Sequence, residues 1–285
     1  MIREEIKKYL NTEWLGRELI CHLTTKSTNL DAKQAAASGC SHGCTVVSDE
    51  QTAGRGRLDH AWLSPAGLNI YVSFVLKPRV MTSAFPQIPV ICAIALHQAL
   101  AGMAPSLSLA LKWPNDLLTA DTHRKISGIL CEGVTMKDRS LAVVVGIGIN
   151  VNSSLNDFSD DLRATATSLK MATGQSWNRE QVLAAFLNRF EIVFDEWQNA
   201  ANLRPFMDYW NRHDLLAGRD IAILQDGKTE EGVSRGIDDE GRLLLETPDG
   251  VRLVHAGDVH LRWSRKLKPL TTTQRSRWSG PLPGY

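Results

Sequence analysis

The stretch Leu141–Val151 (LAVVVGIGINV) constrains the fold most, because it is apolar along its length and carries no charged side chain. A strand with one solvent-facing side alternates apolar and polar residues, whereas a continuous apolar run is typical of a strand covered on both faces. Gly146 and Gly148 remove side chains from one face, and Asn150 ends the run with an amide that can donate and accept hydrogen bonds. The sequence therefore predicts a layered domain built around this strand.

The segments around this strand alternate between strand and helix patterns. Further strands are predicted at Cys21–Thr25, Cys44–Val47, Asn69–Lys77, Leu107–Trp113 and Arg124–Leu130. Helices are predicted at Met1–Tyr9, Ser27–Ser38, Pro86–Ala101 and Trp177–Gln198. The last helix is the clearest, because Asn178 can cap it and its aromatic and aliphatic residues form one stripe that faces the core.

After Gly218 the pattern changes to short β segments separated by Asp-Gly turn signals. This pattern predicts a small all-β, barrel-like module of about 45 residues. We expect three parts: a main domain over residues 1–216, this module over 217–264 (the end module), and a basic tail over 265–285 whose composition predicts disorder.

Cysteine content and charge argue against several classes of protein. Five cysteines, an odd number, favour a reducing compartment, and we expect a cytoplasmic protein. No Asp or Glu follows Asp258 but six Lys and Arg do, so the preceding body carries a net charge of −5 and is not expected to bind nucleic acid.

The longest apolar run, Ile88–Leu96, is too short to span a bilayer, so no membrane association is expected. Cys40-Ser41-His42-Gly43-Cys44 lacks a second ligand pair of zinc-type spacing, so no metal cage is expected.

The loop Gly54-Arg55-Gly56-Arg57 predicts an anion site. Two glycines let the backbone approach a ligand closely, and two guanidinium groups suit carboxylate and phosphate oxygens. A solvated basic turn between strands is the alternative interpretation. Gln51 before the loop and Trp62 after it favour a ligand that carries both an anionic group and an uncharged or flat moiety.

In two other segments, polar side chains stand where a predicted helix begins or a predicted strand ends. Ser27-Thr28-Asn29 opens a helix, and its side chains can either cap that helix, through Thr28, or contact a ligand. Pro114 interrupts its strand, so Asn115 and Asp116 are expected to leave the sheet at its rim, as turn residues or as ligand contacts. Lys125 starts the next strand beside the space that Gly128 leaves, and it is interpreted either as a solvated edge charge or as an anion ligand.

The ordered set of motifs resembles the biotin protein ligases, also named biotin–[acetyl-CoA-carboxylase] ligases. The matching motifs are Ser27-Thr28-Asn29, the Glu50–Trp62 loop, KWPND at Lys112–Asp116, RKISGIL at Arg124–Leu130, GIGIN at Gly146–Asn150, and Ser234-Arg235-Gly236-Ile237-Asp238. They cover roughly residues 6–262 in the order of the family. The form resembled is the monofunctional one, without the DNA-binding domain of the bifunctional repressors.

The resemblance implies an α+β fold. It has a mixed β-sheet with helices packed on one face, like class II aminoacyl-tRNA synthetases, followed by a small SH3-like β-barrel. It also implies an ATP-dependent ligase that activates biotin as biotinyl-5′-AMP and transfers it to a lysine of the biotin carboxyl carrier protein of a carboxylase. ATP and biotin are then substrates, and Mg²⁺ enters with ATP, near Asn115 or Asp116. The sequence does not disclose the oligomeric state and leaves a homodimer open.

The resemblance also assigns roles to residues of this sequence. The catalytic residues that it implies are Arg57, Lys125 and Asp116. The biotin-binding set that it implies is Ser27, Thr28, Asn29, Gln51, Gly54, Arg55, Arg57, Lys125 and Gly128. The set that it implies for ATP and the adenylate is Arg57, Trp62, Asn115, Lys125, Asn150 and Arg235. In this scheme Arg57 and Lys125 stabilise the acyl phosphate, and Asp116 orients the attacking amine.

The sequence departs from the family pattern in two places. Asp59-His60 stand where the family often has Gly-Arg, which predicts weaker retention of the adenylate. The connection Thr119–His123 between two intact motifs is interpreted as a solvent-side insertion. Two alternative functions remain: a lipoate or octanoate ligase or transferase, and a biotin-binding regulator without turnover. The polar set Ser27, Thr28 and Gln51 disfavours the first, and retention of Arg57, Lys125 and Asp116 disfavours the second.

Overall fold

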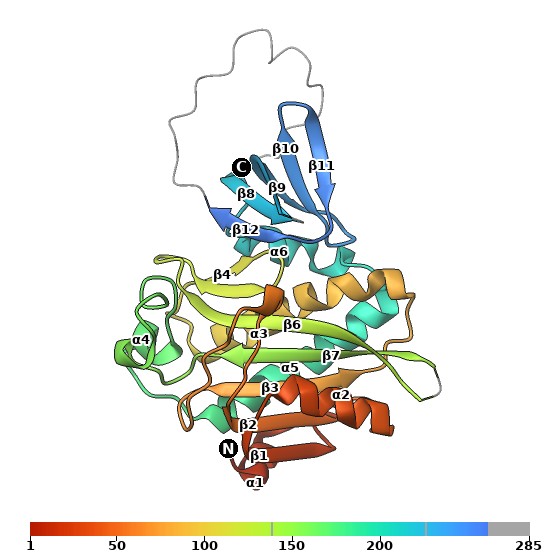
Figure 1. Cartoon of the computed structure of the whole chain (residues 1–285), viewed down its shortest axis with the longest axis vertical. Coiled ribbons are helices and arrows are strands. Elements are labelled where there is room, and N and C mark those ends of the chain that lie inside the picture. Colours follow the sequence, from red (N-terminus) through yellow and green to blue (C-terminus); the bar gives the residue numbers. More distant parts are fainter. Residues whose placement is uncertain (138, 226, 262–285) are drawn as a thin grey trace.

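The computed structural model of the chain describes residues 1–137, 139–225 and 227–261 (Figure 1). The helices are α1 (Arg3–Tyr9), α2 (Thr28–Ser38), α3 (Ile88–Met103), α4 (Leu169–Thr173), α5 (Arg179–Ala200) and α6 (Met207–His213), with short 3₁₀ helices at Arg57–Asp59, Thr82–Gln87, Leu155–Asp157 and Arg204–Phe206. The strands of the main domain are β1 (Leu19–Thr25), β2 (Thr45–Gln51), β3 (Ile70–Leu76), β4 (Leu109–Lys112), β5 (Asp116–Thr119), β6 (Lys125–Thr135) and β7 (Leu141–Ile149). Those of the end module are β8 (Asp220–Gln225), β9 (Lys228–Ile237), β10 (Leu243–Thr247), β11 (Gly250–Val254) and β12 (Asp258–Leu261).

The main domain is a seven-stranded mixed sheet in the order β1-β2-β3-β7-β6-β5-β4. The pair β1 and β2 is parallel, and every other neighbouring pair is antiparallel. The long helices α3 and α5 pack on one face, and α2 packs on the other face against β2, β3 and β7 (Figure 1). The predicted α+β class is confirmed, with α2 as an added layer on the ligand side.

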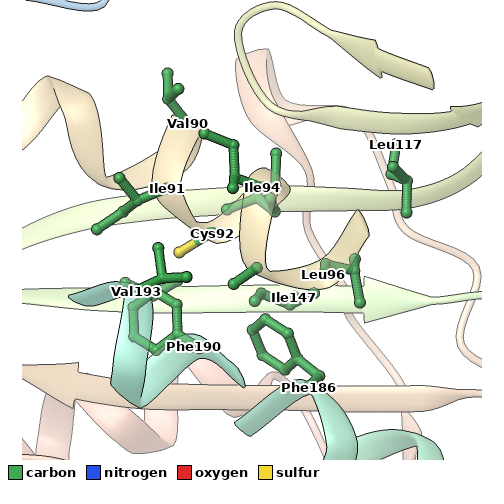
Figure 2. Close-up of a cluster of buried hydrophobic side chains, with 14 of the residues drawn as sticks. Val90, Ile91, Cys92, Ile94, Leu96, Leu117, Ile147, Phe186, Phe190 and Val193 are labelled. Atoms are coloured by element: carbon green, nitrogen blue, oxygen red, sulfur yellow. The ribbon is translucent and has the colours of Figure 1, made fainter. Parts of the chain in front are cut away.

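The core lies between the sheet and the helices α3 and α5 (Figure 2). Phe186 and Phe190 of α5 and Ile94 of α3 are fully buried there against Ile147 of β7. Among the described residues, Thr82–Met103 is the one helical segment long and apolar enough, by length and composition alone, to cross a membrane. This segment extends beyond the apolar run Ile88–Leu96 considered from the sequence, and packing within the core accounts for its hydrophobicity.

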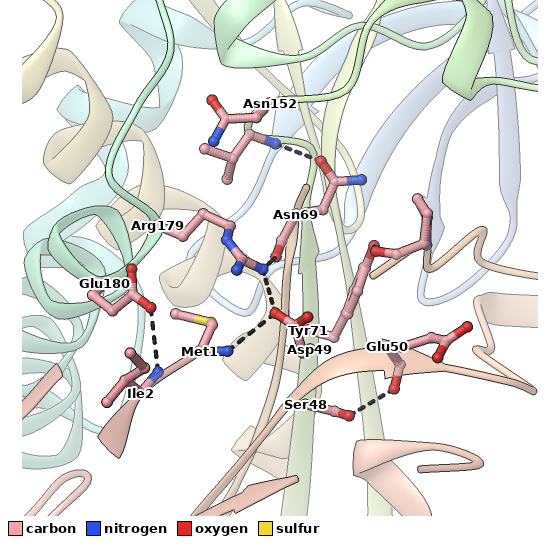
Figure 3. A network of polar contacts seen from close by, with 12 residues as sticks. Met1, Ile2, Ser48, Asp49, Glu50, Asn69, Tyr71, Asn152, Arg179 and Glu180 are labelled. Carbon is pink, nitrogen blue, oxygen red and sulfur yellow. Dashed lines mark hydrogen bonds and ion pairs between the residues drawn. The ribbon is translucent and has the colours of Figure 1, made fainter. Parts of the chain in front are cut away.

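A polar network holds the end of β2 against the start of α5 (Figure 3). Arg179 Nη1 lies 2.7 Å from Asp49 Oδ1 and donates to the carbonyl oxygen of Asn69 at 3.1 Å. The amino group of Met1 also contacts Asp49 Oδ1, at 3.0 Å. Asn69 Oδ1 accepts from the backbone N–H of Val151, just after β7. These contacts fix the strand that leads into the glycine loop.

One strand of the sheet was not expected from the sequence. Pro114 follows a cis peptide bond and sits in a tight turn, after which Asp116 starts β5 and returns the chain to the sheet beside β4. The prediction that Asp116 leaves the sheet is therefore wrong, and the first residue of the connection Thr119–His123 belongs to a strand. Thr119 ends β5, and the turn after it connects β5 to β6.

The end module is a five-stranded antiparallel sheet in the order β11-β10-β9-β8-β12. The predicted all-β character of the end module is confirmed, and the module lies at the β4 edge of the main sheet, beside α6 (Figure 1). Trp113 Nε1 donates to the carbonyl oxygen of Gly241 at 2.9 Å across this boundary. The predicted division between residues 216 and 217 falls in the connection from α6 to β8. The tail at 265–285 lies outside the described residues.

Candidate active site

A cavity of 960 Å³ opens over the sheet face that carries α2. Its lining includes most of the residues predicted from the sequence: Ser27, Thr28, Asn29, Gln51, Gly54, Arg55, Arg57, Trp62, Asn115, Asp116, Lys125, Gly128 and Asn150. These residues come from the N-terminus of α2, the loop after β2, the β4–β5 turn, β6 and the end of β7. The fold therefore brings five separate segments of the sequence to one place.

One end of the cavity is a chain of neutral hydrogen-bonding groups. Gln51 Oε1 accepts from the backbone N–H of Thr28 at 2.9 Å and from its hydroxyl at 3.1 Å. Gln51 Nε2 donates to Ser64 Oγ at 2.9 Å. The hydroxyl of Ser73, a buried residue of β3, lies 2.7 Å from Thr28 Oγ1 and 2.6 Å from Asn29 Oδ1. We call this end of the cavity, with these five residues, the neutral end.

The alternative that Thr28 caps α2 with its own side chain is wrong. The N-cap position belongs to Ser27, which makes no side-chain capping bond, and the amide of Gln51 satisfies the N–H of Thr28 instead. Ser27 is 2% exposed and lines the cavity. A side chain of strand β2 thus closes the helix N-terminus, and the Ser27 side chain is not used as its cap.

Glycines form the floor beneath Trp62. A Cβ added at Gly148 would lie 2.3 Å from the indole ring of Trp62, and one at Gly128 would lie 3.0 Å from Lys125 Nζ. A Cβ at Gly146 would lie 1.8 Å from Asn29 Oδ1. The bare backbone of β6 and β7 is therefore required for these side chains to pack. The indole Nε1 of Trp62 is buried and has no hydrogen-bond partner among the residues that the structure describes.

The two predicted cations converge on adjacent residues of the β4–β5 turn. Arg57 Nη1 donates to Asn115 Oδ1 at 3.2 Å, and Lys125 Nζ forms an ion pair with Asp116 Oδ1 at 2.6 Å. Lys125 Nζ also lies 5.5 Å from the centre of the Trp62 ring. Because Asn115 and Asp116 are neighbours in the chain, the guanidinium and the ammonium both face the same part of the cavity. Together these charges can stabilise an anionic acyl phosphate.

The glycine loop is closed by its own backbone. The N–H of Gly56 donates to the carbonyl oxygen of His60 at 2.7 Å, and that of Trp62 donates to Gly54 at 2.9 Å. A Cβ at Gly54 would lie 2.5 Å from the carbonyl oxygen of Trp62, so only glycine fits there. Leu58 has a positive φ of 52°, which is uncommon for a leucine, and it turns the loop back on itself. The Arg55 side chain is exposed at the rim.

Arg235 does not reach the cavity. Its guanidinium pairs with Glu246 on the neighbouring strand β10 and is not part of the lining. The prediction that Arg235 reaches back toward the nucleotide is not supported by this arrangement. The end module instead contributes Asp258 and His260 of β12 to the cavity wall. No local sequence signal distinguishes these two residues, because only the docking of the end module brings them there.

Other lining residues were also missed from the sequence. Thr122 and His123, in the turn interpreted as solvent-side, line the cavity. Lys112, although it belongs to the KWPND motif, received no role. Its position could have been found, because Leu109 and Leu111 face the core and alternation then places Lys112 on the cavity face.

The described part of the chain offers no cluster of three or more His, Cys, Asp or Glu side chains that could hold a metal ion. All five cysteines are free thiols. Burial raises the pKa of the Cys44 thiol far above its usual value, so this thiol stays protonated. The oxygen atoms of Asn115 and Asp116 are of the kind that Mg²⁺ prefers.

Comparison with known proteins agrees with this geometry. Residues 20–150 match the Biotin/lipoate A/B protein ligase family, and residues 217–262 match the biotin protein ligase C-terminal domain. A sheet with an arginine–lysine anion site beside a neutral polar pocket is consistent with a ligase that activates a carboxylic acid. The chain belongs to the biotin/lipoate A/B protein ligase family, and within it to the biotin protein ligases.

Individual relatives support this assignment. The bifunctional ligase/repressor BirA of Bacillus subtilis is 36% identical over 257 residues, covering 90% of this chain and 78% of that protein. The biotin–[acetyl-CoA-carboxylase] ligase of Paracoccus denitrificans is 34% identical, covering 82% of this chain and 97% of that protein. The structure of the Aquifex aeolicus biotin protein ligase in complex with biotin and ATP superposes with a TM-score of 0.75 at 30% identity, covering 87% of this chain and all of that one.

Proposed function

We propose that this chain is an ATP-dependent ligase that activates biotin and attaches it to a lysine of a biotin carboxyl carrier domain. In the first step a carboxylate oxygen of biotin attacks the α-phosphorus of ATP, and the bond to pyrophosphate breaks. In the second step the carrier lysine attacks the carbonyl carbon of biotinyl-5′-AMP. The bond to AMP breaks, an amide forms and the amine loses a proton. The relatives are named biotin–[acetyl-CoA-carboxylase] ligases, which supports a carboxylase carrier domain as the acceptor.

The observation that carries this proposal is the convergence of Arg57 and Lys125 on the adjacent residues Asn115 and Asp116. The first step creates negative charge at the α-phosphorus, and fixed cations there stabilise the transition state more than the ground state. Asp116 belongs to the same turn, so it can bind the acceptor ammonium once the adenylate has engaged Lys125. The reaction needs positioning more than a dedicated acid–base pair.

The neutral end of the cavity favours biotin over lipoate. The cyclic urea of biotin offers two N–H donors and one carbonyl acceptor, and Ser27, Thr28 and Gln51 supply matching groups. An apolar dithiolane would leave these polar groups without partners, at a cost in binding. Lipoate ligation is therefore the alternative that the experiment must exclude.

The proposal also covers the metal ion, the cellular compartment and the oligomeric state. The residues present fit a Mg²⁺ ion that arrives with the triphosphate, where it would neutralise phosphate charge, with Asn115 or Asp116 as its protein ligands. The five free thiols support a reducing compartment such as the cytoplasm. The net charge of −5 on the body of the chain disfavours nucleic acid as a partner. A monomer and a homodimer carry out the same chemistry in this scheme.

The decisive experiment is incubation with MgATP, a carrier domain and either biotin or lipoate, followed by intact-mass measurement of the carrier. We expect a mass gain of one biotinyl group that depends on ATP and on the carrier lysine. A gain with lipoate but not with biotin would overturn the proposal in favour of a lipoate ligase. Binding of biotin without any mass gain would favour the regulator without turnover.

A further inference from the structure

A straight row of residues crosses the cavity floor on four neighbouring strands. Gly148 of β7 is directly opposite Gly128 of β6, Gly128 is opposite Asp116 of β5, and Asp116 is opposite Lys112 of β4. Residues directly opposite each other in antiparallel strands share one face, and neighbouring strands are about 4.8 Å apart. The row therefore continues from the surface beneath Trp62, past Asp116, to Lys112.

Lys112 is a cation of this cavity that has neither an ion-pair partner within the described structure nor a role in the proposed function. The Lys and Arg residues among the described lining are Arg55, Arg57, Lys112 and Lys125. Lys125 is paired with Asp116, Arg57 is bonded to Asn115, and Arg55 is exposed at the rim. Lys112 is half-buried, and its ammonium makes neither a hydrogen bond nor an ion pair within the residues that the structure describes.

Charged groups from three other strands surround Lys112. Asp116 of β5 and Lys125 of β6 act on it from within the main sheet, and Asp258 of β12 acts on it from the end module. Asp258 is itself 3.3 Å from His260 Nε2. Burial lowers the pKa of Lys112, as does Lys125, whereas the two carboxylates oppose this shift. A half-buried ammonium without a direct partner is costly unless an anion fills the space beside it.

We propose that Lys112 binds the pyrophosphate portion of ATP and stabilises it as the leaving group of the first step. This inference rests on the proposed function and adds a third cation to Arg57 and Lys125. The α-phosphate lies between those two groups, beside Asp116, and the β- and γ-phosphates then extend one strand further along the row. At this position, on β4, the ammonium group of Lys112 can neutralise their negative charge.

The test compares Lys112→Met with Lys112→Arg, and uses Lys228→Met as a matched control on the exposed side of the end module. Biotin-dependent exchange of labelled pyrophosphate into ATP measures the first step. Transfer of biotin from chemically synthesised biotinyl-5′-AMP to the carrier domain measures the second step alone. Thermal unfolding checks that each variant is folded.

For Lys112→Met we expect the KM values of both ATP and pyrophosphate to rise about tenfold or more, since a charged hydrogen bond to phosphate is lost. Transfer from the preformed adenylate should stay within about twofold of the wild type, Lys112→Arg should retain most of the affinity, and Lys228→Met should behave as the wild type. Unchanged KM values for ATP and pyrophosphate would overturn the inference. A loss confined to the transfer step would also overturn it, because Lys112 would then act on the acceptor lysine. A wild type that makes no adenylate would instead refute the proposed function.

Discussion

Two parts of the cavity are built in different ways: the neutral end, and the group formed by Arg57, Lys125, Asn115 and Asp116, which we call the charged centre. At the neutral end, Gln51, Thr28 and Ser73 are already joined by hydrogen bonds, and their positions are fixed by buried strands. In the charged centre, Arg57 and Lys125 are held by Asn115 and Asp116, groups that a phosphate can replace. One end is therefore organised before the ligand arrives, and the other exchanges internal partners for ligand atoms.

This difference has a physical cause. A neutral hydrogen-bond chain can be buried at little cost when each group has a partner. An isolated buried cation costs far more, so the charged centre needs temporary carboxylate and amide partners until the substrate supplies its own anion. The neutral end thus recognises the shape of the ligand, and the charged centre, where ion pairs rearrange, carries out catalysis.

The largest effect should follow removal of a cation from the charged centre. Lys125→Ala or Arg57→Ala should slow adenylate formation by about a hundredfold or more, because the transition-state charge loses a fixed partner. Single-turnover formation of biotinyl-5′-AMP measures this rate. Arg235→Ala is the matched control and should change the rate by less than about twofold, because its guanidinium pairs with Glu246 outside the cavity. Near-normal turnover of the Lys125 and Arg57 variants would refute their assigned roles.

A smaller effect, confined to biotin, should follow damage to the neutral end. Gly146→Ala places a Cβ 1.8 Å from Asn29 Oδ1, so Asn29 must move away from Ser73. We expect biotin affinity, measured by calorimetry, to fall about tenfold while the KM of ATP stays near its wild-type value. Gly133→Ala on β6 is the control, since its added Cβ meets nothing within 4 Å. An equal loss for ATP and biotin would show that the two ends are not independent.

A still smaller effect is expected at the rim of the charged centre, where the family often has an arginine and this chain has His60. His60 lines the cavity, and His60→Arg adds a permanent cation close to the adenylate. Release of biotinyl-5′-AMP should slow about threefold to tenfold, since one more charged contact is made. Dissociation of radiolabelled adenylate from the enzyme measures this rate. Faster release from the variant would contradict the expectation of weak retention in the wild type.

Asp214, outside the cavity, is a carboxyl whose burial outweighs the favourable effect of the Arg219 charge and of the backbone N–H of Leu216. Burial raises its pKa to about 6, and Oδ2 has no hydrogen-bond partner in the described structure. A carboxyl whose pKa is raised on folding favours the folded state when protonated, so the free energy of unfolding falls as the pH rises through about 6. Asp214→Asn should remove this slope, so that the stabilisation it brings is about 2 kcal/mol larger at pH 8 than at pH 4.5. Urea unfolding at both pH values measures the difference, and activity at pH 7 should be unaffected.

Local sequence patterns were sufficient to predict much of the fold. Continuous apolar residues identified β7, the aromatic stripe and its Asn178 cap identified α5, and regular turn signals identified the strands of the end module. These features depend on side chains close together in the chain, and periodicity reports them directly. Strand β5 was missed because it has only four residues, too few for a periodic signal to build up.

The sequence by itself determined which kinds of residue form the site: two cations, a neutral polar set and a floor of glycines. Only the tertiary structure decided their arrangement. It closed α2 with Gln51, joined Arg57 and Lys125 through one turn, left Arg235 outside, and brought Asp258 in beside Lys112. The physical reason is that strand register and domain docking depend on contacts between residues far apart in the chain, which no local pattern encodes.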